Sequence, residues 1–105
     1  MDDSFKTREL QFEAKFAHDE ELKFKIVAHR NRLFAAWVAD QMGDGAPPDY
    51  ADNFVEFALG RTPETLIEYA LSALHDHGVA LIDIKLCKAF AQAEEQAQAE
   101  VMNEI

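Results

Sequence analysis

The residues best suited to chemistry lie in two short clusters that contain histidine beside carboxylates. In the first cluster, His18 to Glu21, a helix places only Glu21 or Leu22 on the face of the histidine, which leaves too few ligands for a metal. In the second, His75 and His77 diverge by about 200° on a helix, so they do not converge on one ion. We therefore expect no metal site.

The other reactive residues also lack partners. The spacing of Asp44, Asp49 and Asp52 does not fit an EF-hand loop, so turn and capping roles are expected for them. Cys87 has no identifiable histidine and acid partners, and it lies beside an apolar stripe as a small core or boundary residue. The chain also has no glycine-rich phosphate loop and no nucleophile elbow. We expect no catalytic residues and no enzyme, so a protein-binding role becomes the default.

Composition narrows the class of partner. The chain has 105 residues, of which 49% are hydrophobic, which suits one domain with a small core. Residues 1–42 carry seven Lys/Arg and eight Asp/Glu, whereas residues 43–105 carry three and twelve. Such an acidic body is a poor partner for nucleic acid or an anionic membrane. The single cysteine indicates a reducing compartment, and no segment approaches the roughly 20 apolar residues of a membrane span.

The longest element is expected over residues 10–43, where neither proline nor glycine interrupts a helix before Gly43. Its apolar face runs back almost to the N-terminus, with Trp37 as the largest core candidate. The residues of this face are Phe5, Phe12, Phe16, Ile26, Val27, Leu33, Phe34, Trp37 and Val38. A helix of that length is out of proportion to 105 residues, so one end of it is expected to extend past the core.

Two interpretations remain open for residues 1–18. They form either an ordinary first helix whose phenylalanines join the core, or an arm that is disordered or frayed alone and folds onto a partner. We divide the chain into this arm and a single domain over residues 19–105, with a core helix from Asp19 to Met42. Arg30 and Asp19 lie near the centre of the apolar stripe, where they could face another helix, pair with charges on that helix, or mark the place where the stripe leaves the core.

Three further helices follow the loop GDGAPPD at residues 43–49, and Pro48 is expected in the first turn of the second helix. Thr62-Pro63-Glu64 is a strong start for the third helix, with a capping hydroxyl and proline at its first position. Apolar residues at helical spacing then define the buried faces: Tyr50, Phe54, Phe57, Ala58; Leu66, Ala70, Leu71, Leu74; Leu86, Phe90, Ala93, Ala97, Val101. The short run from Val79 to Ile82 is expected to dock the last connection. The sequence predicts an all-α four-helix bundle with a long first helix and a flexible N-terminal arm.

One long motif is more specific than these patterns. Residues 12–22 read FEAKFAHDEEL, followed by Phe24-Lys25, Arg30-Asn31, Leu33, Trp37 and Met42-Gly43. This run resembles the zeta subunit of the alpha-proteobacterial F-type ATP synthase, whose pattern reads close to FEAKFAHDEELxFK, then an Arg/Asn pair and an apolar stretch with a tryptophan. The resemblance is specific over about residues 5–43.

The resemblance implies a small four-helix inhibitor of ATP hydrolysis by the synthase. Its N-terminal arm is expected to insert at a catalytic interface between the alpha and beta subunits, near the central rotor stalk. There it blocks rotation in the hydrolytic direction and leaves synthesis largely free. The resemblance also implies a monomer in the cytoplasm, peripheral to the inner membrane through the synthase, with no cofactor required and weak adenine nucleotide binding by the bundle.

Residues of the arm are the expected contacts with the partner. Three phenylalanines at helical spacing would anchor the arm in a groove, and the charged residues among them would read its rim. The set is Phe5, Lys6, Arg8, Glu9, Leu10, Phe12, Glu13, Lys15 and Phe16, followed by the family-motif junction His18, Asp19, Glu20 and Glu21.

The second half departs from the family pattern, at residues 54–63 and in a fourth helix rich in alanine and glutamine instead of basic residues. A divergent paralogue is therefore an open alternative. The rival function is a non-inhibitory helical adaptor or a nucleotide-sensing bundle, with binding carried by the acidic second half.

Overall fold

The computed structural model describes the backbone of residues 2–104 and the side chains of residues 19–104. Its elements are α1 (Asp2–Met42), the 3-10 turn η1 (Gly43–Gly45), α2 (Tyr50–Phe57), α3 (Pro63–Asp76) and α4 (Asp83–Asn103). No strand occurs among the residues that the structure describes. The prediction of an all-α fold with four helices is confirmed.

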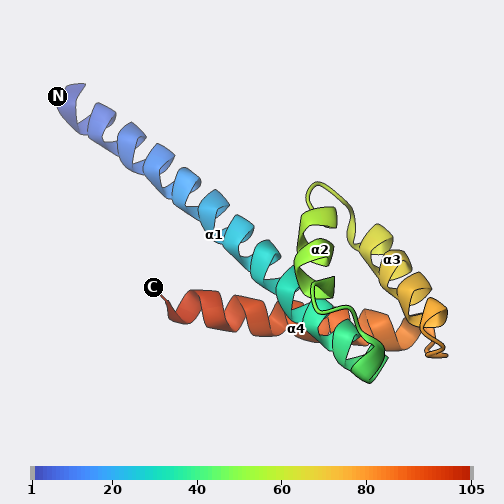
Figure 1. Cartoon of the computed structure of the whole chain (residues 1–105). Coiled ribbons are helices and arrows are strands. Elements are labelled where there is room, and N and C mark those ends of the chain that lie inside the picture. Colours follow the sequence, from blue (N-terminus) through green and yellow to red (C-terminus); the bar gives the residue numbers. More distant parts are fainter. Residues whose placement is uncertain (1, 105) are drawn as a thin grey trace.

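Helix α1 dominates the shape of the molecule. Its 41 residues form a rod about 60 Å long, and the molecule measures 68 × 25 × 24 Å. The C-terminal part of α1 packs against α2 and α4, whereas its N-terminal part projects beyond the other helices (Figure 1). The backbone of α1 does not break near residue 18. The division into an arm of residues 1–18 and a domain of residues 19–105 stays a prediction, since the side chains before Asp19 lie outside the described part.

The helix ends mostly follow local sequence chemistry. Gly43 and Gly78 adopt φ values of 69° and 76°, and each follows a helix, as expected for residues without a Cβ. The hydroxyl of Thr62 accepts a hydrogen bond from the backbone N–H of Thr65 at 3.3 Å and caps α3. The expected place of Pro48 is wrong: α2 begins only at Tyr50, and the prolines form the preceding turn.

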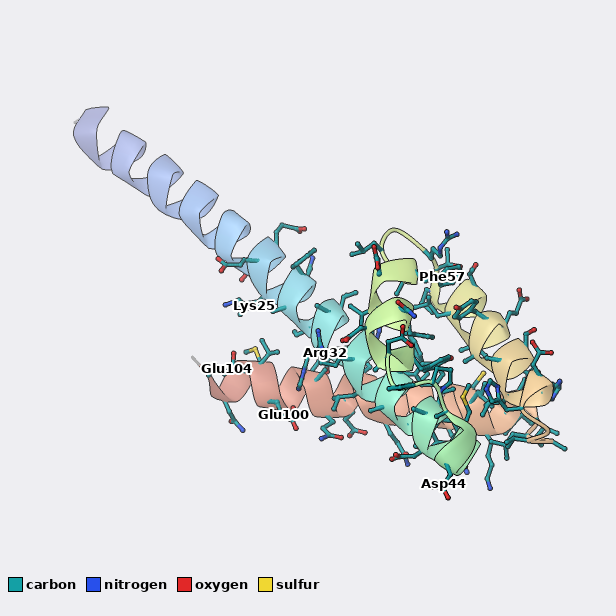
Figure 2. The ribbon with its side chains drawn as sticks, viewed as in Figure 1. Lys25, Arg32, Asp44, Phe57, Glu100 and Glu104 are labelled. Carbon is teal, nitrogen blue, oxygen red and sulfur yellow. The ribbon has the colours of Figure 1, made fainter. Side chains whose placement is uncertain are left out.

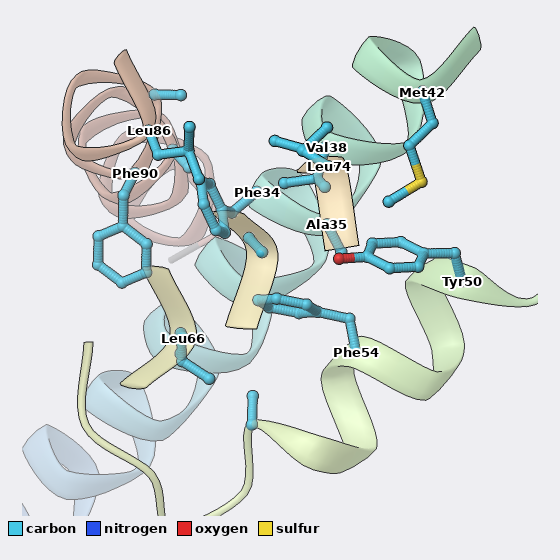
Figure 3. Packing of buried hydrophobic residues seen from close by; sticks show 14 residues of the cluster. Phe34, Ala35, Val38, Met42, Tyr50, Phe54, Leu66, Leu74, Leu86 and Phe90 are labelled. Carbon is cyan, nitrogen blue, oxygen red and sulfur yellow. The ribbon is translucent and has the colours of Figure 1, made fainter. Parts of the chain in front are cut away.

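The core joins one face of each helix around an aromatic centre (Figure 3). Phe34 of α1 is fully buried and makes edge-to-face contacts with Phe54 of α2 and Phe90 of α4, with ring centroids 5.7 and 5.2 Å apart. Leu66 and Leu74 of α3 are also fully buried. Edge-to-face aromatic pairs stabilise a core beyond the effect of their buried area. The predicted faces of the last three helices therefore meet those of α1.

Four expected positions in the core prove wrong or incomplete. Trp37 is only half-buried and stacks on Phe34, which takes the centre instead. Cys87 is exposed, so it lies outside the core. Ile82 is 65% exposed, so only Val79 and Leu81 of the short apolar run dock against the core. Val27 is 41% exposed, although it continues the apolar face of α1.

Candidate partner-binding site

The predicted contact residues lie on the projecting part of α1. The uninterrupted helix α1 includes the backbone of all the predicted contact residues that precede Asp19. These residues are Phe5, Lys6, Arg8, Glu9, Leu10, Phe12, Glu13, Lys15, Phe16 and His18. Their side chains lie outside the described residues, so their assignment as contacts stays a prediction. What the structure does describe is the root of this projection, which we define as residues 19–32 of α1.

The family-motif junction is a solvated surface. Asp19, Glu20 and Glu21 are exposed. Glu20 lies 3.5 Å from the ammonium of Lys23, and Glu21 lies 3.6 Å from that of Lys25. Both pairs join residues three or four positions apart on one helix. Exposed pairs of this kind stabilise a helix by only a few tenths of a kcal/mol.

Arg30 pins the root to α4. Its side chain is only 8% exposed, and its Nη1 lies 3.5 Å from Oε1 of Glu94. Its Nε and Nη2 donate to Oδ1 of Asn31 at 3.1 and 3.0 Å. The guanidinium carbon lies 4.6 Å from the centre of the Phe90 ring. A buried cation that is both paired and hydrogen-bonded holds two helices in one register, so the expected pairing of Arg30 with another helix is confirmed.

A second link between α1 and α4 lies six residues further along α4, at Glu100. Nε2 of His29 bonds Oε2 of Glu100, and Nε2 of Gln96 donates to Oε1 of the same carboxylate at 2.8 Å. The hydrogen bond from His29, followed by that from Gln96, lowers the pKa of Glu100 below its ordinary value. This link is solvent-accessible, so it orients the helices with less energy than the Arg30 contact.

A basic hollow lies between the root and the C-terminal end of α4. Its volume is about 300 Å³, and its lining includes Lys25, His29 and Arg32 of α1 beside Phe24. Glu104 of α4 closes the other side. Figure 2 shows Lys25 and Arg32 on α1 and Glu100 and Glu104 on the part of α4 that passes near them. The hollow could hold an anion beside an aromatic ring, although Arg32 also lies 3.7 Å from Asp52.

An apolar groove lies on another side of the same root. Its volume is about 280 Å³, and it separates α1 from the connection between α2 and α3. Phe24 and Leu59, 67% and 68% exposed, lie in its lining with Val27. Arg61 also belongs to this lining. We name the surface formed by Phe24, Val27, Val55, Leu59 and Arg61 the α1–α2 groove.

Sequence reasoning missed both of these surfaces. In the sequence, Phe24 stands out only as part of the family motif. Leu59 and Arg61 stand out only because they belong to a segment that departs from the family pattern. Residues of the groove are up to 37 positions apart in the chain, and the His29–Glu100 link spans 71. Only the unusual isolation of Arg61 in an acidic half was a signal that sequence alone could have used.

The remaining chemistry-capable residues have structural roles. His77 bonds the carbonyl of Ala73 at 2.8 Å and caps the C-terminal end of α3, whereas His75 bonds the carbonyl of Leu81 at 3.1 Å and ties the following connection to this helix. Among residues with described side chains, no group of three His, Cys, Asp or Glu is placed to hold a metal. Nor does any helix in that part have the length and apolarity to cross a bilayer. The described geometry is suited to holding and presenting a helix.

Comparison with known proteins gives a match to a family. The model of the family described as ATPase inhibitor subunit zeta matches residues 1–100, far beyond the motif at residues 5–43. No curated protein and no solved structure matches the chain.

Proposed function

The chain belongs to the family of the ATPase inhibitor subunit zeta, and from that premise we propose how it inhibits. Residues 1–18 insert as a helical arm at an interface between the alpha and beta subunits in the catalytic head of an F-type ATP synthase. The arm lies near the rotor stalk there and blocks rotation in the hydrolytic direction. The protein acts as a monomer in the cytoplasm, held near the inner membrane only through the synthase, and needs no cofactor for inhibition.

The observation that carries this proposal is the projection of α1. One helix extends from the centre of the core to Asp2, and its root is held by Arg30 and His29 against α4. A rigid root transmits force from an inserted arm to the bundle, so the bundle becomes a bulky stop. The three phenylalanines at helical spacing supply anchors for a groove, and the charged residues between them orient the arm.

The test compares the intact protein with a form lacking residues 1–18, using the catalytic head of the same organism. The described core begins at Arg30 and Phe34, so the shortened form retains every buried contact of the bundle. We expect inhibition of ATP hydrolysis by the intact protein and none by the shortened form, with little effect on ATP synthesis by the whole complex.

A full-length variant with Phe5, Phe12 and Phe16 changed to alanine makes the same test without deletion. Its matched control changes the exposed Ile82 and Ile84, which lie far from the arm, to alanine. The arm variant should lose inhibition at least about tenfold, as expected when aromatic anchors are removed. Equal inhibition by the intact and shortened forms, or none by either, would sink the proposal.

We propose weak adenine nucleotide binding as a second property, at the basic hollow. The observation in its favour is the grouping of Lys25, His29 and Arg32 beside Phe24, where a phosphate would compete with their carboxylate partners Glu21, Glu100 and Asp52. An aromatic ring and nearby cations suit a base and its phosphates.

Amide shifts during titration with ATP, ADP and magnesium test this second property. We expect the shifts to centre on residues 24–32 and to fade in Arg32→Gln, while Lys88→Gln behaves as wild type. Shifts confined to residues 43–105, combined with no inhibition, would favour the rival instead.

A further inference from the structure

The α1–α2 groove collects exposed apolar side chains at one place. Phe24, Val27 and Leu59 are three of the large apolar residues that remain exposed within the described part, and all three line the groove. Val55 of α2 and Ala58, which follows this helix, also line the groove. Scattered exposed apolar residues are ordinary, but a cluster of them in a concavity is typical of a binding surface.

The lining of this groove includes a cation, Arg61, whose side chain is held by neighbouring groups. Nε of Arg61 donates to the carbonyl of Phe57 at 2.7 Å, and its guanidinium carbon lies 4.0 Å from the centre of the Phe57 ring. That ring stacks on Tyr69 with centroids 4.0 Å apart. Among the described side chains, no carboxylate lies within ion-pair distance of Arg61. The two terminal nitrogens of the guanidinium can therefore pair with a carboxylate from outside.

Two occupants from the chain itself fit poorly. The segment before residue 19 cannot reach back into the groove while α1 remains one straight helix, because it runs away from the bundle (Figure 1). A second copy would bring together two bodies whose residues 43–105 carry three basic and twelve acidic residues each. Like charges on both sides oppose such a contact.

We propose that the α1–α2 groove binds an amphipathic helix of the catalytic head, whose apolar face covers Phe24 and Leu59 and whose carboxylate pairs with Arg61. This inference rests on the proposed function, since it gives the inhibitor a second contact with the same partner. Phe24 lies two turns after Phe16 on one helix, a rise of about 12 Å. A partner that holds the arm therefore faces the groove as well, and the two contacts act as one continuous interface.

The experiment uses full-length variants and the catalytic head of the same organism, with affinity measured by the inhibition constant. Leu59→Asp and Arg61→Glu should each weaken inhibition at least about tenfold. Their matched controls are Ile84→Asp, an equally exposed isoleucine outside the groove, and Lys88→Glu, an exposed cation on α4. The controls should inhibit within about twofold of wild type, and thermal melts should show all four variants folded.

The outcomes separate this inference from the proposed function. If Leu59→Asp and Arg61→Glu inhibit like wild type while deletion of residues 1–18 abolishes inhibition, the groove is not a contact and the arm mechanism stands. If the shortened form inhibits as well as the intact protein, the arm mechanism fails. No inhibition by the wild type overturns both.

A photo-crosslinking residue at position 59 identifies the occupant directly, with position 84 as the control. Crosslinks from position 59 to the alpha or beta subunit, absent from position 84, support the inference. Crosslinks to a second copy of the chain, or to its own residues 1–18, would identify a different occupant of the groove and overturn the inference.

Discussion

The two parts of α1 share one helical pattern of apolar residues but have opposite surroundings. From Arg30 to Met42 the helix buries Phe34, Ala35 and Val38 completely, whereas Phe24 and Val27 remain exposed one to two turns earlier. The difference comes from the neighbours, because α2 and α4 cover only the C-terminal part of α1 (Figure 1). The periodicity of apolar residues thus shows that a helix can pack against a neighbour, but it does not show that a neighbour is present. The part of α1 that α2 and α4 leave uncovered remains available to a partner.

The largest expected difference comes from replacing one phenylalanine by alanine in each of the two parts of α1. Phe34→Ala removes the ring that joins α1 to Phe54 and Phe90, so it should lower the free energy of unfolding by about 3 to 5 kcal/mol. Phe24→Ala should change it by less than about 0.5 kcal/mol, since that ring is mostly exposed. Urea denaturation followed by circular dichroism measures both. Equal losses would mean that the root also packs in solution.

The next effect tests the boundary between the two parts. Arg30→Ala removes the contact with Phe90 and leaves Asn31 without its donors, so we expect a loss of about 1 to 2 kcal/mol in unfolding free energy. Glu94 is half-exposed, so water can solvate it after the change. Arg30→Met keeps most of the packing and should cost less than Arg30→Ala. If the two variants are equally destabilised, the charge rather than the packing of Arg30 holds the root.

The core and the root also differ in the hydrogen-bond partners of their buried polar groups. Arg30 has several partners, whereas the buried hydroxyl of Tyr50 has no hydrogen-bond partner among the described residues. Tyr50→Phe should therefore be neutral or stabilise the fold by up to about 1 kcal/mol at neutral pH. Burial, and then the charge of Tyr69, raises the pKa of Tyr50 from 10.0 to about 12.

The sign of the pH effect follows from that raised pKa. The neutral phenol is favoured in the folded state, so its contribution is fully present below pH 10 and is lost as pH rises through about 12. Denaturation between pH 9 and pH 12 should show wild type losing more stability than Tyr50→Phe. Parallel pH profiles for the two proteins would contradict the assigned burial of this hydroxyl.

The sequence predicts those features of the fold that depend on residues close together in the chain. The cap at Thr62, the glycine ends of α1 and α3, and the buried row from Leu86 to Val101 all follow from local spacing. Sequence reasoning misjudged Trp37 and Cys87, because their burial depends on the rotation of one helix against another. The groove forms because the tertiary fold brings Phe24 and Leu59 close together. The local spacing of apolar residues does not predict this proximity. The arm residues are named only by the motif and the family, so they stay predictions.

The smallest effect lies at the exposed link between the root and α4. His29, and then Gln96, lowers the pKa of Glu100, so the contribution of this carboxylate to stability is present above its ordinary pKa. That contribution is lost as pH falls through the lowered pKa. His29→Gln should raise the pKa of Glu100 back toward its ordinary value, and Gln96→Ala should raise it less, as measured by NMR titration of the side-chain carboxyl. Because the carboxylate is solvated, neither change should move the midpoint of urea denaturation as far as Arg30→Ala does. An unchanged titration in His29→Gln would show that the histidine does not hold Glu100 in solution, and Arg30 would then be the main polar anchor of the root on α4.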